Sequence, residues 1–347
     1  MAYTTIKKPS DYFNTVLFDG DSSSSKAITV GFRPDLTWQK SRNVAANFVL
    51  IDQVRGATKV ISSDTTASED TVDNGTGITT TNTGIIVSEA SDWSSINRTG
   101  RNIVSWNWLG ANGTASNTDG SISSTVSANT TSGFSIVKYT GNATSGATVG
   151  HGLGVTPKVI IIKGLGTTYN WIFGHNSLST NWTNYLTLST TDASAAATNI
   201  FNDTAPTSSV FSIGNALGVN TNSSDYIAYC FAEKTGYSKF GSWTGNGNAD
   251  GPFVYTGFKP EFVILKNASG TNQWLMFDNA REPANVMGTY LEPNSSAAEA
   301  NFDGFDFLSN GIKMRTSNGA WNTSGSTYIY MAFAEEPLVG DNPATAR

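Results

Sequence analysis

One pattern of residues occurs three times, without gaps, in this chain of 347 residues. Each copy has a proline, a lysine six residues later, an aromatic residue eight residues after the lysine, and Asp or His four residues after that. The copies are Pro34, Lys40, Phe48 and Asp52; Pro157, Lys163, Trp171 and His175; and Pro260, Lys266, Trp274 and Asp278. Internal repeats constrain a fold strongly, because every copy must form the same structural unit. The sequence therefore predicts three repeats of one unit.

The strands expected in each repeat are short and apolar. Two repeats close on the similar runs 226–233 and 328–335, and the first repeat closes on the weaker match 103–108. The run 262–266 is typical of a central strand that is covered on both faces. The 34 glycines and the many Ser, Thr and Asn residues favour strands and turns over helices. We therefore expect an all-β fold with three tandem β-sandwich repeats of jelly-roll-like topology.

Composition and the repeat pattern give the expected domain boundaries. The segments are an N-terminal arm at 1–12, repeat 1 at 13–110, a linker at 111–132, repeat 2 at 133–236, repeat 3 at 237–337 and a C-terminal tail at 338–347. The linker is expected because this stretch is rich in Gly, Ser, Thr and Asn, as flexible linkers are. Repeats 2 and 3 follow one another with almost no connecting segment.

Charged residues are scarce, at 14% of the chain, and the net charge is −6. This balance gives no electrostatic support for nucleic-acid binding. No apolar run reaches the length of about 18 residues that a membrane span needs, and the first residues lack the apolar core of a secretory signal. The single cysteine, Cys230, lies in an apolar run, so we interpret it as a small buried hydrophobe rather than a nucleophile. We expect neither a nucleic-acid partner nor a membrane span.

Catalytic and metal-binding patterns are weak. The only histidines, His151 and His175, have no serine nucleophile motif around them. Two histidines without a Cys-x-x-Cys motif give little support for a metal site. Glycan hydrolysis needs two carboxylates in one cleft, and the acidic residues Glu299, Asp303 and Asp306 have no spacing that singles out a pair. We expect no enzyme activity, no cofactor and no metal.

An Asp-x-x-Arg sequence follows the aromatic position in two repeats, at Asp52 with Arg55 and at Asp278 with Arg281. One interpretation is a polar functional site. The other is a structural ion pair that ties a strand end to the next loop, since arginine binds a carboxylate in a fixed two-pronged geometry. Repeat 2 has His175 and a leucine at these positions. This replacement favours the structural ion pair.

Aromatic residues in polar segments are the candidates for ligand contacts. Trp182 and Tyr185 lie in the segment where repeat 2 lacks the Asp-x-x-Arg sequence, and Trp321 lies in a polar loop of repeat 3. Aromatic faces stack on the apolar parts of polar ligands, while neighbouring amides and hydroxyls form hydrogen bonds. The alternative is that all three are packing residues.

Several stretches together resemble a known family of virion proteins. They are the opening 2–13, the start of repeat 2 at 133–141, the endings Tyr-Ile-x-x-x-Phe-Ala-Glu, and the block 306–317, which looks like that family's last repeat. These proteins come from tailed bacteriophages of marine bacteria and are described as tail-fibre or host-recognition proteins. The resemblance spans essentially the whole chain, although repeat 1 lacks the Phe-Ala-Glu ending. It implies a phage structural protein without catalysis, and it brings no binding residues.

The leading hypothesis is a tail fibre or adhesin on the virion surface of a phage, made in the host cytoplasm. Its expected partners are other virion tail proteins and a host cell-surface glycan or protein, and by analogy with such fibres we expect a homotrimer. The first alternative is a head fibre or capsid decoration protein. The second alternative, from another functional class, is a tailspike that cleaves glycans.

Overall fold

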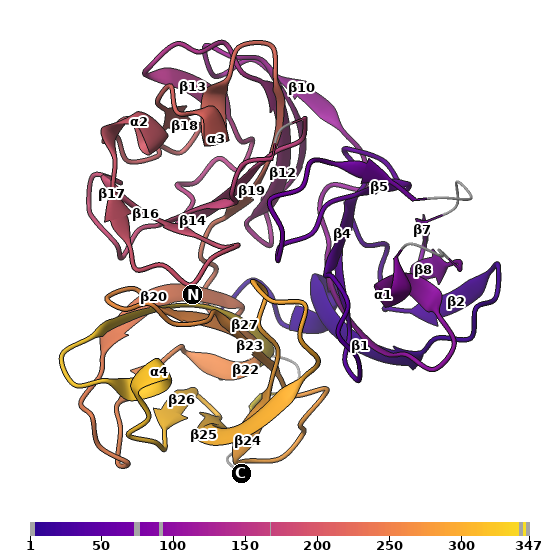
Figure 1. The fold of residues 1–347 in the computed structure, drawn as a ribbon, viewed down its shortest axis with the longest axis vertical. Helices are drawn as coiled ribbons and strands as arrows, with labels where there is room; N and C mark the ends of the chain where they lie inside the picture. Colours follow the sequence, from indigo (N-terminus) through magenta and orange to yellow (C-terminus); the bar gives the residue numbers. More distant parts are fainter. Residues whose placement is uncertain (1–3, 73–76, 90–92, 167, 340–342, 345–347) are drawn as a thin grey trace.

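The computed structural model describes residues 4–72, 77–89, 93–166, 168–339 and 343–344. Strands dominate this part of the chain, so the all-β prediction is confirmed. The chain forms three lobes around a common centre, one for each sequence repeat (Figure 1). The α-helices among the described residues are single turns, and none is long and apolar enough to span a lipid bilayer.

Each repeat contains its own set of strands. Repeat 1 has the 3-10 turn η1 (Pro9–Asp11), β1 (Phe13–Asp19), β2 (Lys26–Thr29), β3 (Leu36–Ser41), β4 (Val49–Asp52), β5 (Lys59–Val60), β6 (Asp70–Thr71), β7 (Ile78–Thr81), β8 (Gly84–Val87), α1 (Ser94–Asn97) and β9 (Asn102–Trp108). Repeat 2 and the segment before it have β10 (Ala115–Asn117), β11 (Ser124–Asn129), β12 (Phe134–Thr140), β13 (Ala147–Gly150), β14 (Val159–Gly164), β15 (Ile172–His175), β16 (Asn184–Thr187), β17 (Ala195–Ala196), α2 (Thr198–Phe201), β18 (Val210–Ile213), α3 (Leu217–Asn220) and β19 (Asp225–Phe231). Repeat 3 has β20 (Ser238–Thr244), β21 (Phe253–Tyr255), β22 (Phe258–Asn267), β23 (Leu275–Asp278), β24 (Met287–Tyr290), β25 (Ala300–Leu308), β26 (Gly311–Met314), α4 (Gly319–Asn322) and β27 (Thr327–Pro337).

The same order of four antiparallel strands recurs in the three lobes. It is β1-β9-β3-β4 in repeat 1, β12-β19-β14-β15 within the eight-stranded sheet of repeat 2, and β20-β27-β22-β23 in repeat 3. The registers correspond as well, with Leu36 opposite Trp108, Val159 opposite Phe231, and Phe262 opposite Phe333. Pro34, Pro157 and Pro260 each lie two positions before the first residue of these pairs, so the prolines occupy equivalent places.

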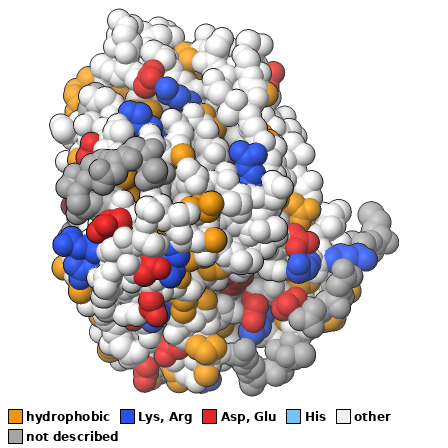
Figure 2. All heavy atoms as spheres, turned by 90° about the vertical axis from the view of Figure 1, so that its right-hand side faces the viewer, with side chains coloured by type: hydrophobic (Ala, Val, Ile, Leu, Met, Phe, Trp, Pro, Cys, Tyr) orange, Lys and Arg blue, Asp and Glu red, His pale blue; other side chains and the backbone are white. Residues whose placement is uncertain are grey.

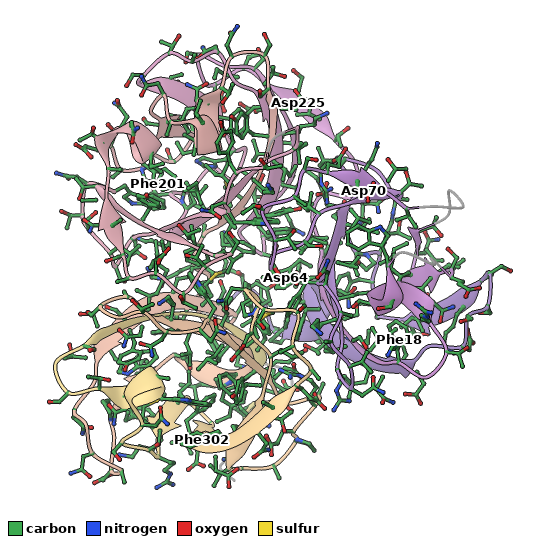
Figure 3. The ribbon with its side chains drawn as sticks, in the orientation of Figure 1. Phe18, Asp64, Asp70, Phe201, Asp225 and Phe302 are labelled. Atoms are coloured by element: carbon green, nitrogen blue, oxygen red, sulfur yellow. The ribbon has the colours of Figure 1, made fainter. Side chains whose placement is uncertain are left out.

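A second, smaller sheet lies on one face of each of these inner sheets. The second sheets are β2-β8-β7 in repeat 1, β13-β18 in repeat 2 and β21-β26-β25-β24 in repeat 3. Apolar residues of both layers form a separate core in each lobe. Phe201, for example, lies inside the lobe of repeat 2 (Figure 3). Two layers around a core are present, whereas the jelly-roll-like topology stays a prediction.

The inner sheets of the three lobes bury their other faces against one another in one shared core. Trp108, Phe231 and Phe333 occupy equivalent positions on β9, β19 and β27, and their ring centroids lie 5.7 to 6.3 Å apart. The repeats therefore form a closed ring with pseudo-threefold symmetry, and they are not a row of modules along a rod. The physical reason is that strands such as β14 and β22 are apolar on both faces, and a lobe's own second sheet covers only one of them.

The segment 111–132, expected as a linker, contains β10 and β11, which extend the sheet of repeat 2. Asp35 of repeat 1 also fixes the start of this segment, because one carboxylate oxygen accepts hydrogen bonds from the backbone of Gly110 and Asn112. The other oxygen accepts from the Ser127 hydroxyl at 3.2 Å. The linker prediction is therefore wrong. Small polar residues suit an alternating strand at a sheet edge as well as they suit a linker.

A buried asparagine ends a helical turn in every repeat, at Asn97, Asn220 and Asn322. Its side-chain oxygen accepts a hydrogen bond from the backbone of the turn that follows the opening strand, at 3.1, 2.8 and 2.9 Å. Its amide group donates to nearby backbone carbonyls in the same lobe. The asparagine precedes the closing strand by five residues in all three repeats. This spacing is a repeat signal that the proline–lysine pattern does not include.

Candidate functional site

Polar side chains at the ends of β4, β15 and β23 cross the seams between the lobes. Asp52 of repeat 1 accepts a hydrogen bond of 2.8 Å from the Tyr229 hydroxyl of repeat 2. Asp278 of repeat 3 accepts one of 3.0 Å from the Trp106 indole of repeat 1. His175 of repeat 2 lies 3.2 Å from a backbone carbonyl of repeat 3. The three contacts run in one direction around the ring, so the equivalent residue of each repeat holds the next lobe.

The predicted ion pair of Asp52 and Arg55 is confirmed. Arg55 Nε donates to Asp52 Oδ2 at 2.6 Å, and both side chains are almost completely buried. Arg55 also donates to the carbonyls of Leu50 and Lys59 and lies 3.3 Å from Glu69. Every strong polar group here has a structural partner, which is what a buried charged pair requires.

The ion pair of Asp278 and Arg281 is confirmed with the same geometry. Arg281 Nε donates to Asp278 Oδ2 at 2.6 Å, and both side chains are inaccessible to solvent. The Arg281 guanidinium also lies over the Trp106 ring, 5.7 Å from its centroid. Glu299 lies 3.7 Å from Arg281 and forms two hydrogen bonds of 2.9 Å with Arg42 of repeat 1. This cluster therefore joins repeats 3 and 1.

The histidine of repeat 2 has a physical explanation at this seam. The residue of repeat 3 equivalent to Trp106 and Tyr229 is Met331, whose side chain has no donor. A buried aspartate would lack a partner there, and its charge would be unfavourable. His175 Nδ1 accepts from the backbone of Ser177 at 3.0 Å, so Nε2 carries the proton and donates to the Tyr330 carbonyl. Burial lowers the pKa of His175 to about 4, which keeps the ring neutral.

In repeats 2 and 3 the lysine and the aromatic residue of the repeat pattern also form hydrogen bonds across the seams, whereas Lys40 of repeat 1 donates to the carbonyls of Ser41 and Val44 in its own repeat. Lys163 Nζ donates to the Thr66 carbonyl of repeat 1 at 2.9 Å, and Lys266 Nζ donates to the Thr191 carbonyl of repeat 2 at 3.1 Å. The indoles of the equivalent aromatic residues cross the same seams, from Trp171 to the Ser62 carbonyl and from Trp274 to the Thr187 carbonyl. Burial lowers the pKa of the pattern lysines Lys40, Lys163 and Lys266 to about 8. In repeats 2 and 3 the lysine and the aromatic residue therefore encode contacts between lobes.

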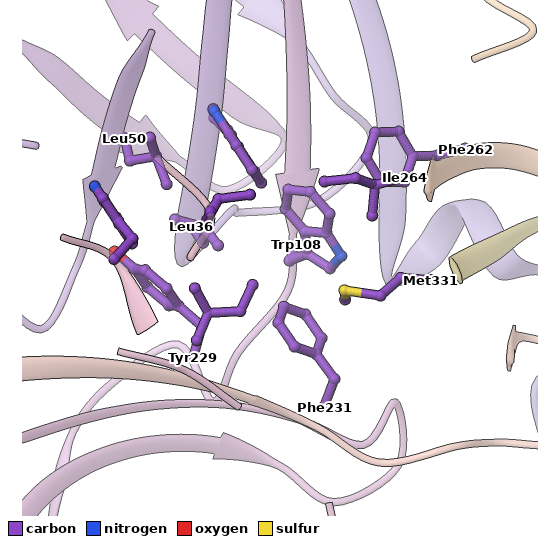
Figure 4. Close-up of a pocket in the computed structure, with 12 residues that line it drawn as sticks. Leu36, Leu50, Trp108, Tyr229, Phe231, Phe262, Ile264 and Met331 are labelled. Atoms are coloured by element: carbon purple, nitrogen blue, oxygen red, sulfur yellow. The ribbon is translucent and has the colours of Figure 1, made fainter. Parts of the chain in front are cut away.

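An apolar cavity lies where the three inner sheets meet (Figure 4). Its volume is about 20 Å³, and residues of all three lobes line it, including Leu36, Trp108, Phe231 and Met331. A water molecule needs two or more polar partners in such a space, and the Tyr229 hydroxyl at its edge already donates to Asp52. The cavity is a packing defect of the shared core and is too small for an organic ligand.

Two of the three predicted ligand-binding aromatic residues are buried. Trp182 is 3% exposed and packs edge-on against Phe201, and Trp321 is 4% exposed and packs against Phe277. The surface-stacking prediction is therefore wrong for both tryptophans, because each fills the core of its own lobe. Tyr185 is half-buried on β16 and stays a candidate.

The other reactive residues also have structural surroundings. Burial raises the pKa of the Cys230 thiol well above its ordinary range, so this buried residue behaves as a hydrophobe. Glu299 and Asp306, two of the acids considered for glycan hydrolysis, form ion pairs with Arg42 and Arg315. Among the described residues, no group of three His, Cys, Asp or Glu side chains is arranged to hold a metal ion.

An open groove of about 420 Å³ lies at the junction of repeats 2 and 3. Glu233 and Lys239 form one wall, with 3.3 Å between their charged atoms. Tyr255 at the end of β21 lines the groove, and 54% of its surface is exposed. Only the shared Phe-Ala-Glu ending marks this site in the sequence, because Tyr255 and Glu233 lie together only in the folded chain. This groove is the candidate binding site.

These features define the class: an all-β protein of three repeats closed around one core, whose buried charged pairs join its lobes. A family model described as Domain of unknown function (DUF7483) matches residues 8–337, and the chain belongs to this family. The match covers all three repeats. No curated protein and no solved structure matches the chain.

Proposed function

We propose that this protein is a non-enzymatic structural protein of a bacteriophage virion, and that it contacts the host cell as a tail fibre or adhesin. The observation that carries the proposal is the closed ring of three repeats, whose charged pairs at Asp52 and Asp278 serve to join lobes. Such a ring is a rigid scaffold for surface loops. The resemblance of the repeat endings to phage host-recognition proteins supports the same function.

The surface also suits an extracellular contact protein. Backbone and uncharged polar side chains, both white in Figure 2, cover most of the face shown, and the charged groups on it are scattered. A surface of this kind binds through hydrogen bonds and aromatic contacts more than through long-range charge attraction. The expected partners are other virion tail proteins and a glycan or protein of the host surface.

The ring offers an alternative to the expected homotrimer, because a single chain already has pseudo-threefold symmetry. Pseudo-threefold symmetry within one chain supplies the geometry that three copies of a smaller chain would give. One copy could therefore occupy a threefold position on a virion, and this observation favours the second candidate, a head fibre or capsid decoration protein. The molar mass of the purified protein, measured by light scattering, separates a monomer from a homotrimer.

The test is the protein content of purified virions of the phage that encodes this chain. We expect the chain in virions, in three or six copies or a small multiple of these if it belongs to the tail. A copy number in the hundreds would instead identify a decoration protein. Absence of the chain from the particles would overturn both.

Loss of polysaccharide viscosity on incubation with the purified protein would support the glycan-cleaving tailspike.

A further inference from the structure

We propose that the groove between repeats 2 and 3 binds a neutral glycan chain, with Tyr255 as its stacking platform. This inference rests on the proposed contact with the host surface and names the ligand class of that contact. The site is built by Glu233 at the end of repeat 2, by Lys239 on β20, and by Tyr255 on β21.

Strand β21 presents two aromatic rings to solvent. Val254 points into the core of repeat 3, so its neighbours Phe253 and Tyr255 both point outward, with 47% and 54% of their surfaces exposed. Alternate residues of a strand lie about 6.5 to 7 Å apart on the same face. The two rings therefore form a row along the strand. An exposed aromatic pair is unfavourable in water unless a partner covers it.

The neighbouring strand makes room for the Phe253 ring on this face. Gly311 lies opposite Tyr255 and has no side chain, and the Phe253 ring packs directly over it. A Cβ at Gly311 would lie 2.9 Å from an atom of that ring. Because Gly311 is the partner of Tyr255 in the sheet, the Phe253 ring leans along the strand toward Tyr255. The result is two exposed aromatic rings on the strand beside the polar groove.

The opposite wall supplies both kinds of hydrogen-bonding group. Glu233 accepts from the backbone of Phe240 at 2.9 Å with one oxygen and lies 3.3 Å from Lys239 Nζ with the other. The side chains of Glu233 and Lys239 stay 26% and 42% exposed, so both remain within reach of a ligand. A sugar hydroxyl can donate to the carboxylate and accept from the ammonium group.

The charges of this wall decide the class of glycan. Glu233 and Lys239 compensate each other, so an acidic or a basic polymer gains no net attraction at the site. The chain as a whole carries a net charge of −6, which disfavours anionic ligands further. An extended peptide added to the edge of β21 is the competing occupant. It is disfavoured because β21 has only three residues to pair with it.

A groove at the junction of repeats 1 and 2 provides an internal comparison. Part of its lining comes directly after β9 in the chain, as part of the first groove's lining comes directly after β19. Its volume is about 370 Å³. Its lining residues are Ala, Gly, Val and Thr, including Ala111, Thr114 and Val126. It has neither an aromatic ring nor a charged group. The exposed aromatic ring and the charged pair of the first groove are therefore absent from this second groove.

Titration calorimetry of the full chain with soluble dextran, mannan, galactan and alginate tests the proposal. We expect at least one neutral polysaccharide to bind, and alginate to bind more weakly. Tyr255→Ala should weaken that binding about tenfold, the change that corresponds to 1.4 kcal/mol. Phe253→Ala should act in the same direction. The affinity should change little between low and high salt, because the ligand carries no charge.

Phe302→Ala is the matched control, because Phe302 is an exposed aromatic residue of the same repeat that lies outside the groove. It should leave the affinity unchanged, and the melting temperatures of all variants identify any that fail to fold. Failure of every neutral polysaccharide to bind would overturn the proposal. So would binding that survives Tyr255→Ala and Phe253→Ala, since the strand edge or another surface would then hold the ligand. Absence of the chain from virions would instead defeat the proposed function and leave the binding result unaffected.

Discussion

The hydroxyl of Tyr229 donates a hydrogen bond of 2.8 Å to Asp52 Oδ2, and the two residues belong to different repeats. The same carboxylate oxygen accepts from Arg55 Nε at 2.6 Å. One buried acid therefore joins its own loop and the next lobe. Equivalent positions at Asp278 and His175 do the same around the ring, so the stability of each lobe depends on its neighbours.

Removal of the hydroxyl should weaken the seam between repeats 1 and 2. In Tyr229→Phe, Asp52 keeps Arg55 but loses a hydrogen-bond donor that water cannot replace. We expect the free energy of unfolding to fall by about 1–3 kcal/mol. Chemical denaturation measures this change. Tyr185→Phe, on a half-buried residue away from the seam, is the control and should have little effect; equal stability of the two variants would contradict the role of the hydrogen bond.

An aspartate at position 175, in the seam between repeats 2 and 3, should destabilise the protein. In His175→Asp the new carboxylate is buried, faces the Tyr330 carbonyl and has a leucine, Leu178, where the other repeats have arginine. We expect a loss of about 3–5 kcal/mol, as for a buried charge without its partner. Adding Leu178→Arg should restore part of this loss. A double variant no more stable than His175→Asp alone would show that the Asp–Arg pair cannot form in repeat 2.

The buried asparagine of each lobe should be intolerant of a negative charge. Asn322 donates through its amide group to the carbonyls of Asn248 and Thr316 at 2.8 and 2.9 Å. In Asn322→Asp a carboxylate oxygen would face these carbonyls, so we expect a loss of more than about 2 kcal/mol. Thermal unfolding at neutral pH measures it. Asn301→Asp, at an exposed position, is the control, and a similar shift for both variants would be evidence against the proposed role of Asn322.

Glu261 should make stability fall as the pH rises. Its carboxyl is buried and accepts from the Thr15 backbone at 2.6 Å, and burial raises its pKa to about 8. The folded state therefore keeps a proton that the unfolded state releases above its ordinary pKa of 4.5. The stabilisation is complete below that value and is lost as the pH rises through about 8, by at most about 1.4 kcal/mol per pH unit.

Glu261→Gln should remove this dependence, because a neutral amide can still accept the hydrogen bond from Thr15. Denaturation curves at pH 5, 6, 7 and 8 compare the variant with the natural chain. The exposed residue Glu89 provides the control variant Glu89→Gln, which should keep the original slope. An unchanged slope in Glu261→Gln would mean that Glu261 is ionised in the folded protein at neutral pH.

Alanine variants of Tyr255 and Trp321 should distinguish a surface aromatic residue that binds ligand from a core aromatic residue that stabilises the fold. Tyr255→Ala should weaken polysaccharide binding without a large change in stability, since its ring is mostly in solvent. Trp321→Ala should instead destabilise the chain by about 3–5 kcal/mol, as expected for a large aromatic residue in a core. Calorimetry and thermal unfolding of the same preparations check both. The reverse outcome would reassign the ligand contact to Trp321.

Much of the fold could be predicted because its signals are local or periodic. The repeat spacing identified equivalent strands, and the Asp-x-x-Arg spacing identified the pair of Asp52 and Arg55, which lie three residues apart. The burial of Trp182 and Trp321 could not be read from the polar residues around them, because long-range packing decides it. The Asn and Ser residues near 111–132 are equally consistent with a linker and with an edge strand, and Asp35 of repeat 1 selects the ordered arrangement.

The sequence by itself determined that the chain is all-β, that it contains three copies of one unit, and which residues recur in them. These properties follow from spacing along the chain. Only the tertiary structure decided that the copies close into a ring, that Lys163 and Trp171 of repeat 2 reach carbonyls of repeat 1, and that Tyr255 lies beside Glu233. The physical reason is that apolar strand faces can be buried against any complementary surface, and the choice among such surfaces depends on the packing of the whole chain.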